Sequence, residues 1–246
     1  MELEGRSFYD VIRDLARRAG IDIPETEEET PQRKAQKLQA ESDRMRLLKL
    51  CELAARFYEA QLTHHPRAQE YIRSRGISAG LQQRFRLGYA PDAWDALLKV
   101  LAQRGVPHEL AELSGMLIRR EGVAALAPGA PATPHSHYDR FRERVMFPLL
   151  VPVVGAAAKT AASLGDVIAF GGRVLPALAA KDAAGGAGKT EGAKYINSPE
   201  TPLYKKGDNL FGLHAAREPI RQRRQVVVVE GNFDVISLHQ HGFDNT

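Results

Sequence analysis

The sequence contains one cysteine and no long apolar run, and these two absences exclude several classes of protein. Because Cys51 is the only cysteine among 246 residues, this chain has neither a disulfide framework nor a zinc ribbon or finger built on two or more thiolates. The apolar runs are shorter than the ~20 residues that a membrane-spanning helix needs, and no charged segment followed by an apolar one opens the chain. We therefore expect a soluble, cytoplasmic protein with no membrane partner.

Composition and length indicate a folded protein with a modestly basic surface. Hydrophobic residues make up 43% and charged residues 26% of the sequence, close to the globular average. The chain is long enough for one large domain or two small ones, at ~150 residues per domain. The net charge of +4 gives only a weak preference for a polyanionic partner.

The spacing of apolar residues changes along the chain from helical to strand-like. Helical spacing is strong from about residue 33 to 63, and shorter helices are predicted up to residue 105. Two β-like runs follow at 145–154 and 167–175, and Pro148 and Pro152 prevent the first from being a regular central strand throughout. This order predicts an α+β fold, in which a helical and mixed α/β region precedes a Rossmann-like βα unit.

The last residues predict the first strand and helix of that parallel βα unit. The valines at 226–229 indicate a strand buried on both faces, and a helix is predicted from Asp234 to His241. Glu230 falls at the carboxyl end of the strand, where ligands collect in open α/β sheets, and two carboxylates there could hold Mg²⁺. An acidic residue at position 234 is commonly only a helix cap, and two carboxylates alone make a poor Mg²⁺ site. Since one strand of a parallel sheet cannot fold alone, we expect the sequence to break off within a domain.

Basic and aromatic side chains gather in three short segments. In 140–144 every second residue is arginine, so an extended chain would project all three to one side, along a phosphate backbone or simply into solvent. Gly171 and Gly172 precede Arg173, which allows either close approach of a ligand or backbone, or a β-bulge. The third segment spans 194–206 and supplies Lys194, Tyr195, Asn197 and Lys206, of which the lysines suit phosphate and the tyrosine suits base stacking.

Seven segments together resemble the catalytic core of bacterial (DnaG-type) DNA primases, and they occur in the family's order between about residues 45 and 246. They are YIRSRGIS, FRLGYAPDAWD, YDRFRERVMFPL, VIAFGGRVL, KYINSPETPLYKKG, LFGLHAA and VVVVEGNFDVISLHQHG. The resemblance implies four parts: the end of a zinc-binding domain at 1–22, a linker at 23–40, the amino-terminal subdomain of the primase core at 41–224, and a truncated Toprim subdomain at 225–246.

The resemblance also implies roles for individual residues. Arg75, Arg173, Lys194, Tyr195 and Lys206 match positions that bind template or nucleotide. Asn197, Arg140, Arg142 and Arg144 lie in matching motifs. Glu230 matches a metal ligand and possible acid/base group, and Asp234 matches the aspartate of the same motif.

A primase makes short RNA primers for DNA replication by metal-dependent nucleotidyl transfer. The resemblance implies Mg²⁺ or Mn²⁺, a single-stranded DNA template, ribonucleoside triphosphates, a replicative helicase bound through a carboxyl-terminal domain, and a monomer at the replication fork. It also implies Zn²⁺ in the full-length protein, although its ligands are absent here. Because the acidic DxD motif is missing as well, we expect this chain alone not to polymerise. The alternatives are a shortened mobile-element primase and a non-catalytic module that binds single-stranded DNA.

Overall fold

The computed structural model describes residues 15–16, 19, 31–152, 165–176 and 193–246. The chain divides into two compact units, of which the first ends at Asp43 and the second runs from Arg44 to Thr246. Apart from three residues, the predicted zinc-domain remnant at 1–22 lies outside the described residues. The predicted domain boundaries remain predictions.

Helix α2 (Pro31–Thr63) carries the strongest helical pattern of the sequence. From Leu47 to Tyr58, apolar residues three and four positions apart are fully buried, whereas side chains 32–42 are exposed. The segment predicted as a linker therefore becomes helical at Pro31. A Pro at the first helical position suits that start, because its missing N–H would have no partner within the helix anyway.

A four-stranded antiparallel sheet forms the centre of the second unit, in the order β1-β4-β5-β6. The strands are β1 (Gly88–Ala90), β4 (Arg144–Val151), β5 (Asp166–Val174) and β6 (Tyr195–Asn197). Strand β1 pairs with β4 only as far as Met146, so Pro148 faces an open edge and pairs with β5 alone. This confirms the prediction that the run at 145–154 is not a regular central strand throughout, since proline cannot donate a hydrogen bond to a second neighbouring strand.

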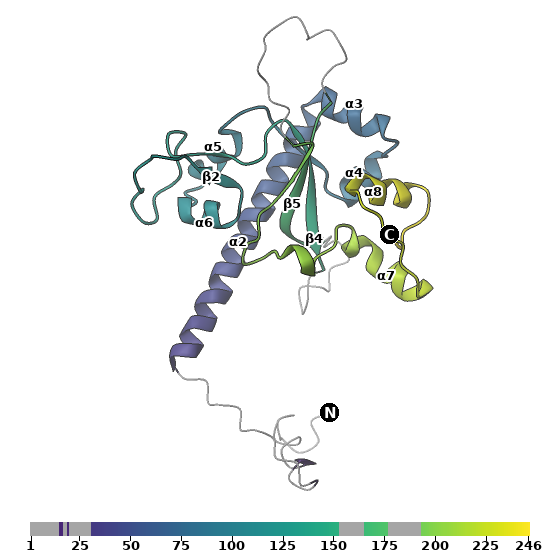
Figure 1. Ribbon diagram of the computed structural model, residues 1–246, viewed down its shortest axis with the longest axis horizontal. Helices are drawn as coiled ribbons and strands as arrows, with labels where there is room; N and C mark the ends of the chain where they lie inside the picture. The colour runs from purple at the N-terminus through teal and green to yellow at the C-terminus, as the bar shows by residue number, and fades with distance from the viewer. Residues whose placement is uncertain (1–14, 17–18, 20–30, 153–164, 177–192) are drawn as a thin grey trace, which may run out of the picture. The chain divides into compact units, whose positions relative to one another are not determined.

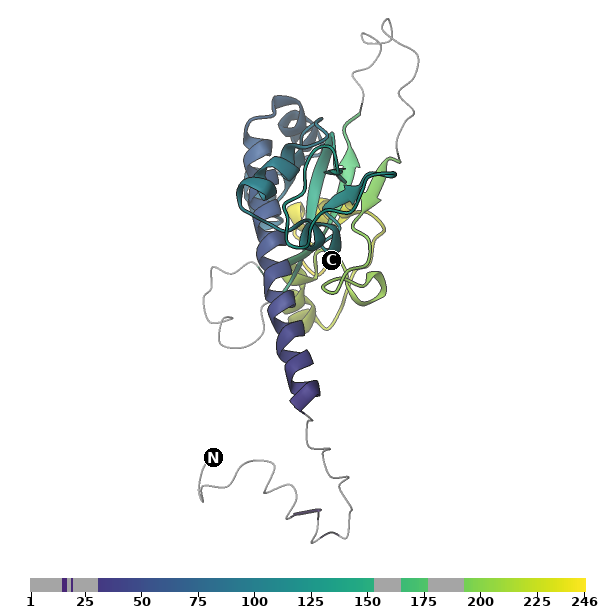
Figure 2. The same ribbon diagram turned by 90° about the vertical axis from the view of Figure 1, so that its left-hand side faces the viewer.

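The two faces of the sheet are covered by different helices (Figure 1). One face packs against the buried side of α2 and against a lobe made of α5 (Ala96–Gln103), α6 (His108–Leu113), β2 (Leu117–Arg119) and β3 (His137–Asp139). Figure 2 shows α2 along that face. The other face packs against α3 (Pro66–Ser74), α4 (Ala79–Arg84) and α8 (Asn232–Gln240), with α7 (Leu213–Arg223) beside them. The mixed α and β architecture agrees with the predicted fold class.

The valine run at 226–229 does not form the predicted buried strand. Val226 and Val228 are 52% and 77% exposed, and the segment has no regular secondary structure. Within the described residues its backbone pairs only with Asn245, which accepts a hydrogen bond from Val227 N–H at 3.0 Å. A parallel strand needs neighbouring strands, and none lies beside this run in the described part of the chain. The following helix was predicted correctly, because α8 ends at Gln240, just before Gly242 with φ +86°.

Asp139 anchors the lobe by capping α5 from a neighbouring strand. Its carboxylate accepts hydrogen bonds from the backbone N–H groups of Leu97 (2.7 Å) and Leu98 (2.9 Å). Burial nevertheless raises the pKa of Asp139 to about 6. The folded state thus holds this proton more tightly than the unfolded chain, whose pKa is near 3.8. The resulting stabilisation is present at low pH and is lost as the pH rises through about 6.

We predict a corresponding pH dependence for Asp139→Asn, which cannot titrate. The free energy of unfolding of the wild type, relative to that of the variant, should fall by about 2 kcal/mol between roughly pH 4 and 6.5. Urea denaturation of both proteins across this range measures the difference and cancels the titration of other groups. A difference that is constant with pH would contradict the prediction.

Candidate functional site

The pairing register of β5 and β6 places four candidate residues on one face of the sheet. Gly171 lies opposite Asn197, and Arg173 lies opposite Tyr195. Because side chains alternate along a strand, Arg173 shares its face with Asn197 and Tyr195. This face is the one that α3 and α8 cover.

Arg173 lies among three aromatic rings. It is 9% exposed, and its guanidinium carbon is 5.0 Å from the ring centroid of Tyr195, 5.5 Å from that of Phe233 and 5.6 Å from that of Tyr71. One terminal nitrogen donates a hydrogen bond to the Tyr195 hydroxyl, whereas the buried Nε has no hydrogen-bond partner. The rings and the hydrogen bond to Tyr195 therefore hold the side chain in place, and its Nε is a buried donor without a partner.

Arg75 reaches the same rings from the end of α3. Its guanidinium carbon lies 5.3 Å from the centroids of both Tyr71 and Phe233, and Nη2 donates a hydrogen bond of 3.0 Å to the Tyr71 hydroxyl. Unlike Arg173, Arg75 is exposed. Two arginines that are far apart in sequence therefore meet around Phe233, which lies between Glu230 and Asp234.

Glu230 lines a cavity of about 210 Å³ together with Asn197, Gly171 and Asn232. A Cβ atom on Gly171 would lie 2.9 Å from the Nδ2 atom of Asn232 and 3.1 Å from the Oδ1 atom of Asn197. Glycine at this position thus allows close approach, as one of the two sequence interpretations held. The register shift of the sheet lies elsewhere, between Leu149 and Leu150.

The two carboxylates occupy the start of α8. Asp234 folds back over the turn, since a Cβ atom on Gly231 would lie 2.6 Å from its Oδ2 atom. Glu230 and Asp234 are both exposed and supply the oxygen ligands that Mg²⁺ prefers. The described residues hold no group of three or more histidine, cysteine or acidic side chains that is placed to bind a metal ion. The donor set therefore suits a hard divalent cation but is incomplete without ligands from a nucleotide or from other protein groups.

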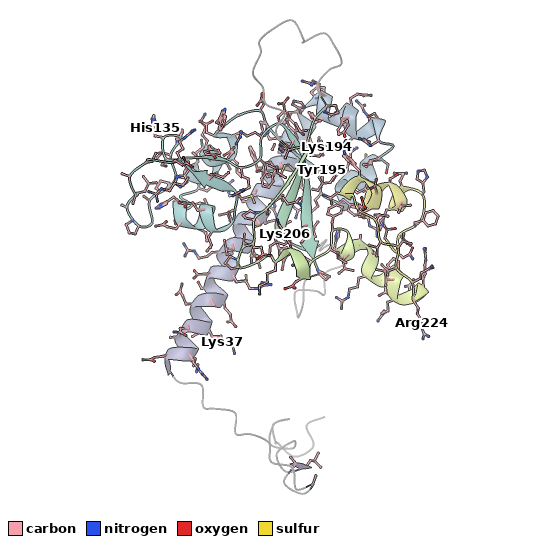
Figure 3. All side chains as sticks on the ribbon, in the orientation of Figure 1. Lys37, His135, Lys194, Tyr195, Lys206 and Arg224 are labelled. Atoms are coloured by element: carbon pink, nitrogen blue, oxygen red, sulfur yellow. The ribbon has the colours of Figure 1, made fainter. Side chains whose placement is uncertain are left out.

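Lys194 and Lys206 lie on the segment that borders this face, as Figure 3 shows with Tyr195 beside Lys194. The carbonyl oxygen of Lys194 accepts a hydrogen bond of 3.1 Å from Val174 N–H, which fixes the backbone beside Arg173. Lys206 begins the 3₁₀ helix η2 (Lys206–Asp208), between two residues that line the Glu230 cavity, Tyr204 and Asn209. Both lysine side chains are exposed, so their ammonium groups remain available to phosphate.

The arginines at 140–144 do not form the predicted row, because the chain is not extended there. Glu143 has a φ of +50°, and each of the three guanidinium groups donates to backbone carbonyls in a different place. The acceptors are Gly115 O for Arg140 (2.7 Å), Asp139 O for Arg142, and Gly172 O (3.4 Å) and Lys194 O (3.3 Å) for Arg144. Burial lowers the pKa of Arg140 and Arg144. The expectation of a common direction was wrong, and their role in nucleic-acid binding stays a prediction.

Arg142 takes part in an aromatic cluster that was not predicted. Its guanidinium carbon stacks 3.9 Å from the ring centroid of Trp94, and Tyr138 meets Trp94 edge-on with centroids 5.4 Å apart. Arg120 lies 5.2 Å from the Tyr138 ring. Trp94 is 56% exposed, so part of its ring is free for another planar group. The only signal that the sequence offered for this cluster was its single tryptophan, in the run DAWD.

Two other contributors were missed. Tyr71 lies four residues before Arg75, a spacing that makes helix neighbours, and Phe233 lies within the motif that supplied Glu230 and Asp234. Only the fold shows that their rings separate the two arginines.

Comparisons with known proteins place these features in context. Within the described residues, no helix combines the length and the apolar character that crossing a membrane requires. The family model described as DNA primase catalytic core, N-terminal domain, matches residues 57–217.

Similar curated proteins carry the name DNA primase. The Pseudomonas putida protein (strain KT2440) is 35% identical over 248 residues, covering 100% of this chain and 32% of its own length. The Neisseria meningitidis serogroup B protein is 35% identical over 244 residues, covering 98% of this chain and 34% of its own length. The chain thus spans about a third of the relatives it matches.

Solved structures match as well. The RNA polymerase domain of Mycobacterium tuberculosis primase DnaG, bound to a double-stranded DNA oligomer with a 6-nucleotide overhang, has a TM-score of 0.63 and 32% identity, covering 82% of this chain and 53% of that one. A DnaG primase catalytic domain bound to single-stranded DNA has a TM-score of 0.62 and 32% identity, covering 83% and 53%. The zinc-binding and RNA polymerase domains of Aquifex aeolicus primase have a TM-score of 0.61 and 29% identity, covering 97% and 47%.

Proposed function

Because the chain belongs to the family of the DNA primase catalytic core, N-terminal domain, we propose that it forms the template- and nucleotide-binding part of an enzyme that makes RNA primers for DNA replication. The observation that carries this proposal is the meeting of Arg75 and Arg173 around Phe233, next to the Glu230 cavity. Gly171 and Asn197 line the Glu230 cavity and share their sheet face with Arg173. Cationic groups and a carboxylate in this arrangement suit metal-bound phosphates, because each binds a different part of the same ligand.

The basic residues would bind and orient the two nucleic-acid substrates. Arg173 is pre-organised by its rings, so little side-chain entropy is lost when its guanidinium group binds a phosphate. Lys194 and Lys206 provide point charges for the phosphates of the bound nucleic acid, and the half-exposed Tyr195 ring can stack on a base. These groups contact phosphate and base faces, which every sequence shares, and so they position a template without selecting it.

Glu230 and Asp234 would hold a divalent cation, Mg²⁺ or Mn²⁺, together with nucleotide phosphates. When bound, the metal offsets the charge that develops on the phosphates during nucleotidyl transfer. The rest of the proposal concerns the whole enzyme: a Toprim subdomain that completes this site, zinc in a separate domain, a helicase partner within the primosome, and a monomeric state at a cytoplasmic replication fork.

The second candidate function is a non-catalytic module that binds single-stranded DNA. It is favoured by the incomplete set of metal ligands in the described residues. In the protein as its gene encodes it, Glu230→Gln separates the two. For a primase, this variant should lower primer synthesis by at least about 100-fold, in line with the loss of a key catalytic contact, and leave affinity for single-stranded DNA unchanged. Absence of primer synthesis in the wild type as well, with DNA binding intact, would favour the module.

Trp94 provides a direct probe of template binding, because it is the only tryptophan in the chain. We predict that oligothymidine quenches its fluorescence and that Trp94→Ala weakens binding by roughly fivefold or more, given ~1–3 kcal/mol per stacked base. An abasic strand of the same length and charge should bind without quenching. Equal quenching by both strands would show that stacking is not the cause.

A further inference from the structure

Helix α7 presents a row of arginines that the proposed cleft does not use. Arg217 and Arg221 lie four residues apart, hence one turn apart on the same side of the helix, and Arg224, with a left-handed φ of +53°, caps its carboxyl end. All three side chains are exposed. Figure 3 shows Arg224 at a different edge of the protein from Lys194 and Lys206.

Among the described residues, Glu218 is the acidic partner of this row. Arg221 pairs with Glu218 at 3.0 Å, but the two side chains are 79% and 56% exposed, so the pair is largely screened by water. Within the described part of the chain, the other ion pair of this helix joins Arg223, outside the row, to Asp244 at 2.7 Å. Like charges one turn apart destabilise a helix, and the row therefore weakens α7 rather than supporting it.

The opposite side of α7 is anchored, so the row is held on a fixed support. Proline 219 lies inside the helix and has no N–H with which to bond the carbonyl of Ala215. Arg84, from α4, donates to that carbonyl instead, with an Nη2 to O distance of 3.1 Å. Ala216 is buried against the core. The arginines can therefore be displayed without reorganisation of the helix.

We propose that the row formed by Arg217, Arg221 and Arg224 binds the phosphate backbone of a nucleic-acid strand that extends beyond the cleft. Arg217 and Arg221 are about 6 Å apart along the helix axis, and Arg224 follows at the end of the helix, so the three charges can contact different phosphates of one linear polymer. No exposed aromatic side chain lies within the row, so the contact is to phosphate alone and independent of sequence. This inference rests on the proposed function, in which the cleft holds the same polymer.

The test compares short and long single strands by fluorescence anisotropy over a range of salt concentrations. In Arg217→Gln/Arg221→Gln/Arg224→Gln, affinity for a strand that fills only the cleft should be unchanged. Affinity for a strand several times longer should fall by at least about tenfold at 0.1 M salt, and the slope of log K against log salt should decrease by about 2, at ~0.7 per lost phosphate contact.

Two matched variants separate a local contact from a general loss of charge. Lys49→Gln/Arg56→Gln/Arg104→Gln removes three exposed charges elsewhere and should leave the affinity for both strands unchanged. Replacing the three α7 arginines by lysine should keep most of the affinity for the long strand. Unchanged binding of the long strand by the glutamine variant overturns the proposal, as does an equal loss in the control variant.

The remaining outcomes are also decisive. Suppose that Lys194→Ala/Lys206→Ala weakens binding of both strands while the α7 variant weakens binding of neither. Then only the proposal for the α7 surface is wrong. If neither variant changes the affinity for either strand, the proposed binding of nucleic acid in the cleft is wrong as well. Weakened binding to phosphatidylserine vesicles with unchanged binding to the long strand would assign the row to a membrane and overturn the proposal.

Discussion

Replacing Gly88 with alanine is expected to destabilise the protein by about 3 kcal/mol or more, at the upper end of the range for overpacked cores. A Cβ atom on this residue of β1 would lie 2.5 Å from the Cβ atom and 2.8 Å from the backbone carbonyl carbon of Tyr58 in α2. Tyr58 is 1% exposed and cannot move aside, because its helix is packed along the sheet. Relief would require α2 and β1 to separate.

The matched control is Gly80→Ala in α4. Nothing lies within 4 Å of a Cβ atom at this exposed position, and the residue is helical. Alanine there should stabilise the protein by about 0.5–1 kcal/mol through helix propensity. Urea unfolding of the two variants against the wild type measures both effects. A small effect of Gly88→Ala would mean that α2 does not contact β1 as closely as described.

Replacing Arg173 with methionine is expected to reduce affinity for single-stranded DNA by at least about tenfold, the effect of losing one hydrogen bond to a charged group. Methionine preserves much of the packing between Tyr71, Tyr195 and Phe233 but supplies no donor. Arg173→Lys should give an intermediate affinity, because it keeps the charge and loses the planar stacking.

Titration of fluorescent DNA with each variant measures this effect, with the exposed Arg104→Met as the control for charge. Thermal unfolding of the same samples shows whether the variants remain folded. Wild-type affinity in folded Arg173→Met would remove this residue from the site.

The sequence predicted those parts of the fold that depend on local pattern. Helices α2 and α8 and the two long strands follow from apolar spacing, and the limited pairing of β4 follows from Pro148. The prediction of a buried strand at 226–229 was wrong because a strand needs neighbouring strands, and the pattern of one segment does not show whether they are present. The expectation that the arginines at 140–144 share one direction was wrong because a single positive φ, at Glu143, redirects the chain.

The candidate site was predicted as a set of residues but not as an arrangement. Arg75 and Arg173 came from motif resemblance, and the rings that join them came only from the packing of α3 and α8 on β5. Trp94 was missed for the same reason, since its partners Tyr138 and Arg142 lie on a distant segment. Contacts between segments far apart in sequence depend on the whole fold, whereas spacing reports only neighbours.

The central claim is that Glu230 and the basic residues border one cleft, where a metal and nucleotide phosphates meet. Paramagnetic broadening of amide signals by Mn²⁺ with a nucleoside triphosphate tests it most directly. We predict strong broadening at Gly171, Asn197 and Asn232, which line the cavity with Glu230, and its loss in Glu230→Gln. Broadening that is centred elsewhere, or that persists in Glu230→Gln, would contradict the claim.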